Sequence, residues 1–401
     1  MIFIVTTGII FYCYEFFLRM LTGAYQNDII YHFNLHGHLS FSFLISSYNL
    51  TYLLMQIPAG LLLDKFGSKK CLTLATLGCG LGNIIFVSGD YLIALIGRLM
   101  IGLGSSFAFI GVLKLSKEYL STRYFGLFAS IVISIGTLAA AFSQQMSVWL
   151  SQYHVSWIYI FIMSGLLALP FFLYFWLSTP TPKDTTHLLP QGADIFQVTL
   201  VVAKQKQLWL NASWAGVFYI PTVVLTSQYG VYFFTQTYNL SRYHATEMVT
   251  FLLLGWVVFS PIVVILFNLC NMPRTFITSF MAAVIAMMII FCFYADFFTP
   301  HLCWYVFIFG IFSSLQVLVW EFFNTVGWQN YTAVGLAFTN MIITGITEAG
   351  QLFSGVVLDL ANHFNHIVSI IMNNTQVMML TFIFMMMISW YIFNRSVRTI
   401  P

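Results

Sequence analysis

An acid and a base stand four residues apart inside an otherwise apolar stretch near the start of the chain. The stretch runs from Met1 to about Tyr25, and its segment YEFFLR carries Glu15 and Arg19. On an α-helix this spacing puts both side chains on one face, about 6 Å apart along the axis, where they can pair. Charges are costly in hydrocarbon, so the pair is a candidate functional site. A salt bridge that only makes two polar side chains tolerable is the alternative.

Three more charged residues lie in or beside apolar stretches. Lys114 and Glu321 fall at the ends of such stretches, and Glu348 falls near the middle of one. A buried carboxylate can take up a proton near neutral pH, so Glu15, Glu348 and Glu321 are candidates for proton coupling. For Lys114 and Glu321, the alternative is a position at the lipid–water boundary.

Polar side chains complete the candidate binding site. The segment WAGVFYIPTVVLTSQYG contains Tyr219, Gln228 and Tyr229, and its Pro221 can bend a helix because it removes one backbone hydrogen bond. Asn340 is a further member, and Gln56, Asn49 and Tyr48 are additional candidates. The predicted substrate-binding set is Glu15, Arg19, Lys114, Tyr219, Gln228, Tyr229, Asn340 and Glu348.

The composition shows which elements must hold these residues. The chain is 60% hydrophobic and 18% aromatic but only 7% charged, against about 25% charged in a soluble domain. Apolar runs of roughly 20 residues, enough to cross a bilayer as a helix, recur along the chain. We predict an all-α integral membrane protein with twelve spans: 2–24, 42–63, 71–89, 91–113, 124–148, 157–178, 207–233, 244–268, 275–297, 301–323, 334–357 and 367–393.

Basic residues predict the orientation, because basic loops stay on the cytoplasmic side. With both termini inside, most Lys and Arg fall in inner loops, whereas Arg242 falls in an outer one. The longest polar stretch, 179–206, then divides the chain into an N-terminal six-helix bundle (1–178), a cytoplasmic linker and a C-terminal six-helix bundle (207–401). Two bundles around a central site are typical of transporters that work by alternating access.

The loop after the second predicted helix reads GLLLDKFGSKK. Its spacing resembles the signature of the major facilitator superfamily, carried here by Gly60, Asp64, Lys65, Gly67, Lys69 and Lys70. The resemblance implies tight packing at the glycines and a gating role for Asp64, which can cap a helix or pair with a base. A second motif, GRLMIGLGSSFAF, places Arg98 before Gly102 and Gly104. Arg98 is expected either to hold two helices together or to take part in proton transfer.

Two segments of the chain repeat one sequence pattern, which supports two related bundles. QIPAGLLLD and QLFSGVVLD place Gln56, Gly60 and Asp64 in the same spacing as Gln351, Gly355 and Asp359. Helices 2 and 11 face each other in this superfamily, so the resemblance implies that Asp64 and Asp359 brace opposite gates. The fifth predicted helix lacks the Gly-Pro pair of many drug exporters, which disfavours multidrug efflux.

The predicted function is transport of a small polar metabolite, coupled to protons. A carboxylate could meet Arg19 and an amino group could meet Glu348, which favours uptake of an amino acid or short peptide. The Glu-x-x-x-Arg spacing is similar to proton-coupled peptide carriers, although Leu18 replaces their second Glu. The alternatives are export of drug-like or siderophore-like compounds, exchange of organic anions, and a receptor or scaffold that no longer transports.

Other classes find little support. No Walker phosphate loop occurs, the six cysteines lie singly, and no nucleophile–base spacing indicates an enzyme. We therefore predict no cofactor, no metal and no nucleic-acid partner. The expected protein is a monomer in a lipid bilayer, in a bacterial inner membrane.

Overall fold

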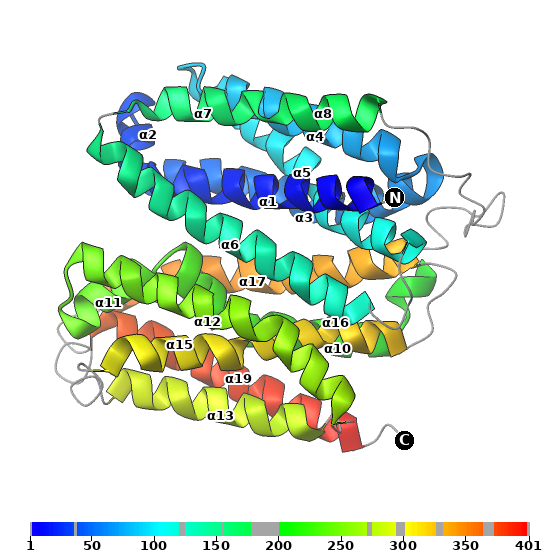
Figure 1. Ribbon diagram of the computed structural model, residues 1–401. Helices are drawn as coiled ribbons and strands as arrows, with labels where there is room; N and C mark the ends of the chain where they lie inside the picture. Colours follow the sequence, from blue (N-terminus) through cyan, green and yellow to red (C-terminus); the bar gives the residue numbers. More distant parts are fainter. Residues whose placement is uncertain are drawn as a thin grey trace. The chain divides into compact units, whose positions relative to one another are not determined.

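The computed structural model describes residues 2–35, 38–119, 125–153, 155–177, 200–270, 275–293, 301–325, 332–363 and 373–398. Every regular element in these ranges is a helix (Figure 1). The prediction of an all-α protein is confirmed. Helices suit a low-charge chain because they satisfy their own backbone hydrogen bonds, as a hydrocarbon environment requires.

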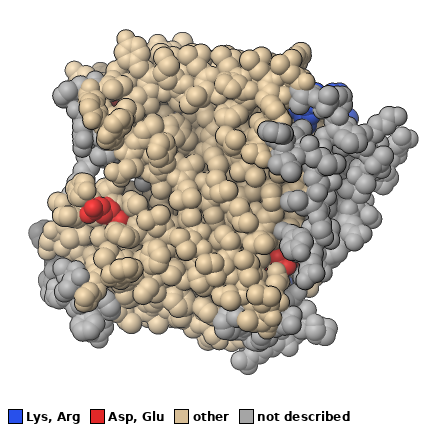
Figure 2. All heavy atoms as spheres, viewed as in Figure 1, with Lys and Arg blue, Asp and Glu red and all other residues tan. Residues whose placement is uncertain are grey.

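Eight helices within the described ranges are long and apolar enough to cross a membrane. They are Tyr91–Ser116, Phe125–Ser147, Trp157–Leu177, Lys206–Ser227, Tyr243–Leu269, Leu302–Glu321, Val334–Ala361 and Asn374–Asn394. Figure 2 shows one face of the molecule, whose described surface is almost entirely uncharged. These features indicate a multi-pass membrane protein. The total of twelve spans and the cytoplasmic position of both termini stay predictions.

The chain forms two compact units. The first comprises Met1–Leu208 together with Val326–Met341, and the second comprises Trp209–Thr325 and Ile342–Pro401. Helix α17 (Thr332–His363) therefore contributes its first ten residues to one unit and the rest to the other. Of the predicted linker, residues 179–199 lie outside the described residues.

The first unit is built from helices of the N-terminal part of the chain. They are α1 (Ile2–Ala24), α2 (Gln26–His32), α3 (His38–Phe66), α4 (Ser68–Phe86), α5 (Tyr91–Tyr119), α6 (Phe125–Gln152), α7 (Trp157–Leu166) and α8 (Ala168–Leu177). Small residues let them approach closely: a Cβ on Gly97 of α5 would lie 2.6 Å from the carbonyl oxygen of Gly82 on α4. Such contacts are typical of packed membrane helices.

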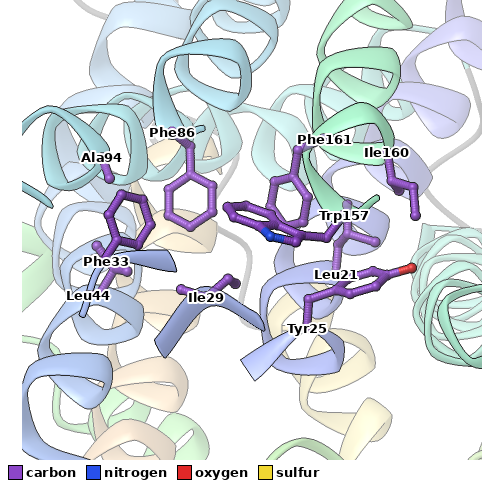
Figure 3. Close-up of a cluster of buried hydrophobic side chains, with 10 residues drawn as sticks. All are labelled: Leu21, Tyr25, Ile29, Phe33, Leu44, Phe86, Ala94, Trp157, Ile160 and Phe161. Carbon is purple, nitrogen blue, oxygen red and sulfur yellow. The ribbon is translucent and has the colours of Figure 1, made fainter. Parts of the chain in front are cut away.

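An aromatic cluster is buried among the helices of this unit (Figure 3). Trp157 of α7 meets Phe86 of α4 and Phe161, and the Phe86 and Phe161 rings stack with centroids 5.2 Å apart. Ile29 of α2 and Phe33 add to the same cluster. Burial of these large side chains fixes the short helix α2 against α4 and α7.

The second unit holds the remaining helices. They are α10 (Lys206–Ser227), α11 (Gly230–Tyr238), α12 (Arg242–Leu269), α13 (Thr275–Phe293), α15 (Leu302–Ser313), η3 (Ser314–Val317), α16 (Leu318–Thr325), α17 from Ile342 onward, and α19 (Asn374–Arg398). Helices α12 and α15 cross at Gly255 and Gly310, each facing backbone of the other helix. Phe291 of α13 packs on Phe233 of α11 with centroids 5.2 Å apart.

Three predicted spans contain a local break or turn. The span 157–178 is two helices, α7 and α8, which meet at Leu167; Figure 1 labels both. The span 207–233 ends as a helix at Ser227, and α11 begins at Gly230, where a Cβ would strike the carbonyl of Leu225. The span 301–323 contains the 3-10 turn η3. Local turns of this kind do not change the apolar character from which the spans were predicted.

Candidate functional site

The carboxylate of Glu15 is buried at the centre of a polar group in the first unit. Glu15 is 1% exposed on α1, and the hydroxyl of Tyr48 on α3 donates a hydrogen bond to its Oε1. The positive charge of Arg19, one helical turn along α1, acts on the same carboxylate. Arg19 itself is half-buried. The carboxylate of Glu15, the guanidinium of Arg19 and the hydroxyl of Tyr48 thus lie close together where α1 packs on α3.

Arg98 joins this group from α5. Its side chain is 1% exposed, and Nη1 donates to Oγ1 of Thr22 on α1 at 2.9 Å. The guanidinium lies over the rings of Tyr48, at 4.9 Å from the centroid, and Phe86, at 5.8 Å. A buried Arg needs such partners because its charge is costly away from water. Arg98 therefore connects four helices, α1, α3, α4 and α5.

A row of polar side chains continues along α3. Tyr48, Tyr52 and Gln56 follow one another at four-residue intervals, so they lie on one helix face. The two tyrosine rings are stacked, with centroids 6.1 Å apart. Asn340, in the α17 residues that belong to the first unit, donates from Nδ2 to Oε1 of Gln56 at 3.0 Å and to the Tyr52 hydroxyl at 3.3 Å. Tyr52 is not among the residues predicted from the sequence, although its four-residue spacing from Tyr48 and Gln56 could have indicated it.

The sequence candidates of the second unit lie along α17 and the turn after α10. Gln351 Nε2 donates to Glu348 at 3.4 Å, and Ser227 donates to Gln351 Oε1 at 3.3 Å. The negative charge of Asp359 acts on the hydroxyl of Tyr229. Gln228 is exposed in the turn between α10 and α11, outside either helix.

Tyr219 lies on α10. Its ring contacts Trp256 of α12 with centroids 6.1 Å apart. Pro221 lies inside α10, as expected for a residue that can bend a helix.

Two charged candidates lie at helix ends. Lys114 donates from Nζ to the carbonyl oxygen of Leu63 at 2.6 Å, which ties α5 to the last turn of α3. Glu321 on α16 is 8% exposed and hydrogen-bonds Asn268, and its Oε2 makes no hydrogen bond within the described part of the chain. Neither residue belongs to the group around Glu15.

The glycines of the two motifs allow a turn and close contacts between helices. Gly67 has φ of 82° and separates α3 from α4, a conformation that favours glycine. Added Cβ atoms on Gly102 and Gly104 would each lie 2.5 Å from a backbone oxygen, of Tyr48 and Ala75 respectively. Asp64 belongs to α3, but its side chain lies outside the described residues. Its gating role therefore stays a prediction.

Metal chemistry finds no support in the described ranges, because no group of three or more His, Cys, Asp or Glu side chains there could hold an ion. Buried charges held within apolar helices are typical of membrane transport proteins.

The chain belongs to the Major Facilitator Superfamily, because the profile of that family matches residues 7–347. This confirms the resemblance inferred from the loop motif. The fold is also similar to two solved structures of FucP: a variant of the E. coli fucose:proton symporter (TM-score 0.70) and FucP in an outward conformation (TM-score 0.69). Each is 14% identical, and each comparison covers 97% of this chain and 98% of the other.

A curated relative is the gallate transporter of Pseudomonas putida, which is 28% identical over 151 residues. The match covers 37% of this chain and 32% of that protein, so it spans about a third of the length of the relative. Together these findings establish a transporter of this superfamily.

Proposed function

We propose that this transporter takes up a small organic molecule bearing a carboxylate, together with protons. The observation that carries the proposal is the buried Glu15, which accepts a hydrogen bond from Tyr48 and feels the charge of Arg19, while Arg98 lies over the Tyr48 ring. The proposed location is a bacterial inner membrane, and the proposed unit is a monomer. Twelve helices in two bundles, with both termini inside, would move by alternating access.

The charges of the group favour an anion. Two guanidinium groups, of Arg19 and Arg98, accompany one carboxylate, of Glu15, so the three together carry one net positive charge when Glu15 is ionised. A substrate carboxylate would balance that charge. Arg19 is the more accessible of the two bases, because it is half-buried whereas Arg98 is 1% exposed. An Arg can bind a carboxylate through two parallel hydrogen bonds.

Glu15 is suited to bind and release the proton that crosses with the substrate. A carboxylate enclosed by helices changes its protonation when a neighbouring charge arrives or leaves, since the two charges interact strongly away from water. If the substrate anion engages Arg19, the pairing between Arg19 and Glu15 weakens and Glu15 binds a proton. Substrate and proton would then cross together, which is symport.

The comparison with a gallate transporter supports a carboxylate substrate, since gallate is a hydroxylated benzoate. Uptake of an amino acid or short peptide is the second candidate, and the position of Glu348 beside Gln351 favours it. An amino group would need a carboxylate of this kind as its partner. Organic anion exchange and export remain outcomes of the same test.

The test is uptake into proteoliposomes under an inward proton gradient. Labelled gallate, benzoate, amino acids and dipeptides are compared in the unaltered protein and in Arg19→Gln, Glu15→Gln and Glu348→Gln. We expect carboxylate uptake that Arg19→Gln abolishes, whereas Glu15→Gln loses gradient-driven accumulation but keeps exchange of substrate for substrate. Glu247→Gln, an exposed carboxylate bound to His244, is the matched control.

The outcomes separate the candidates. Uptake of amino acids or dipeptides that requires both Arg19 and Glu348 would support the second candidate. Accumulation that persists in Glu15→Gln would overturn the proton role of Glu15. A folded protein that moves none of these compounds in either gradient direction would overturn the proposed substrate class.

A further inference from the structure

Gln56 is a fully buried amide whose nitrogen makes no well-formed hydrogen bond within the described residues. Its side chain is 0% exposed, and its Oε1 accepts the hydrogen bond from Asn340. Its Nε2 lies close enough to the Tyr52 hydroxyl to interact with that group. It makes no hydrogen bond of full geometry to an acceptor in the described part of the chain. Leaving a buried donor unsatisfied costs free energy, so an oxygen atom from outside the described residues is expected there in some state of the transport cycle.

Asn340 fixes which way the amide faces. The Nδ2 of Asn340 is a donor, so the Gln56 atom that it meets is the oxygen, and the Gln56 nitrogen must face away. The same Nδ2 also reaches the Tyr52 hydroxyl, which lies one helical turn before Gln56 on α3. Asn340 thereby positions two side chains at once, and what remains is a rigid donor with a defined direction.

A second unused donor lies at the other end of the same row. Nε of Arg98 is buried and makes no hydrogen bond within the described ranges. Arg98 lies over Tyr48, Tyr48 stacks on Tyr52, and Gln56 follows. Tyr48 and Gln56 are separated by eight residues, or about 12 Å along the helix axis. A small molecule with oxygens at both ends could meet donors of both kinds.

We propose that Gln56 is a specificity-determining residue that donates from Nε2 to a hydroxyl or carbonyl oxygen of the substrate, with Asn340 as its positioning residue. The substrate is then a carboxylate that carries further oxygen groups, such as a hydroxylated benzoate. This inference rests on the proposed function, since it assigns the second recognition point of the same site. Arg19 would hold the carboxylate, and Gln56 would distinguish hydroxylated from plain acids.

The experiment measures uptake kinetics for benzoate, para-hydroxybenzoate and gallate. Gln56→Met removes the amide while keeping a side chain of similar length. We expect KM for gallate to rise about tenfold, as for one lost hydrogen bond to a buried group, while the kinetics for benzoate stay unchanged. Asn340→Leu, which frees the Gln56 amide, should shift the same ratio by a smaller factor.

The matched control is Gln351→Met. Gln351 occupies the corresponding place in the second QxxxGxxxD segment, but both ends of its amide are hydrogen-bonded, to Glu348 and Ser227. It should leave the gallate-to-benzoate ratio unchanged. Thermal unfolding and size-exclusion chromatography of each variant verify that it is folded, and gallate-induced thermal stabilisation gives a second measure of binding.

Two results would overturn the inference while the proposed function stands. One is a gallate-to-benzoate ratio that Gln56→Met leaves intact; the other is an equal loss for all three acids, which would make Gln56 a structural residue whose opening a water fills. If the unaltered protein transports and binds none of the three acids, the proposed function fails first and the inference fails with it.

Discussion

The hydroxyl of Tyr48 on α3 donates a hydrogen bond to the buried carboxylate of Glu15 on α1. The two residues are 33 positions apart in the sequence and come from different helices. The contact gives the carboxylate a donor that the charge pattern of the chain did not reveal. Tyr48 contacts both charged groups, because the Arg98 guanidinium lies over its ring.

Tyr48→Phe should keep the ring under Arg98 but remove the hydroxyl. We expect the free energy of unfolding to fall by about 1–3 kcal/mol, because a buried carboxylate loses its donor, and proton-driven uptake to slow. Thermal unfolding in detergent and uptake assays measure the two effects. Tyr14→Phe is the control: Tyr14 donates to the backbone of Ser164 at 2.8 Å, so its loss should lower stability without changing the proton dependence of uptake. Equal behaviour of the two variants would argue against a role for Tyr48 in transport.

Arg98→Lys should weaken the packing of the first unit although the charge is kept. Lysine lacks the flat guanidinium that covers Tyr48 and Phe86, and we expect a loss of about 2 kcal/mol. Chemical denaturation of the purified protein measures it. In a double-mutant cycle with Thr22→Val, the coupling should be about 1 kcal/mol, since Arg98 donates to Thr22. A coupling indistinguishable from zero would refute the hydrogen bond as a stabilising contact.

Gly104→Ala should destabilise the contact between α4 and α5. The added Cβ would lie 2.5 Å from the carbonyl oxygen of Ala75 and 2.6 Å from Sγ of Cys79, so the helices must separate. The expected loss is about 2 kcal/mol. Gly78→Ala is the matched control, because its nearest neighbour would be 3.8 Å away at Met100. The measurement compares their thermal unfolding midpoints, and similar values would show that the close approach is not required.

Lys114→Met tests whether this base binds substrate. Its Nζ donates to the carbonyl of Leu63, so we expect stability to fall by about 1 kcal/mol and KM to stay unchanged. Transport kinetics and thermal unfolding of the same preparation separate the two quantities. An unchanged stability together with a tenfold rise in KM would instead support the substrate role predicted from the sequence.

Composition and local motifs were sufficient for the class of protein. Apolar runs predict helices because helices satisfy their own backbone hydrogen bonds in hydrocarbon. The GLLLDKFGSKK loop predicts the superfamily because its spacing of Gly, Asp and basic residues resembles the signature of that family, and Gly67 has a positive φ between α3 and α4. Both predictions are confirmed by the fold and by the family match. The boundaries of the two bundles, the number of spans, the orientation and the roles of the site residues stay predictions.

The sequence by itself determined the charged candidates, because Glu15 and Arg19 stand one helical turn apart in an apolar segment and local spacing alone decides that. Only the tertiary structure decided their partners. Thr22, Tyr48 and Arg98 meet through packing of α1, α3 and α5, and Asn340 reaches Gln56 across 284 positions of sequence. Helical periodicity predicts which face a side chain occupies, but helix packing decides which other face it meets, and that depends on contacts distributed over the whole unit.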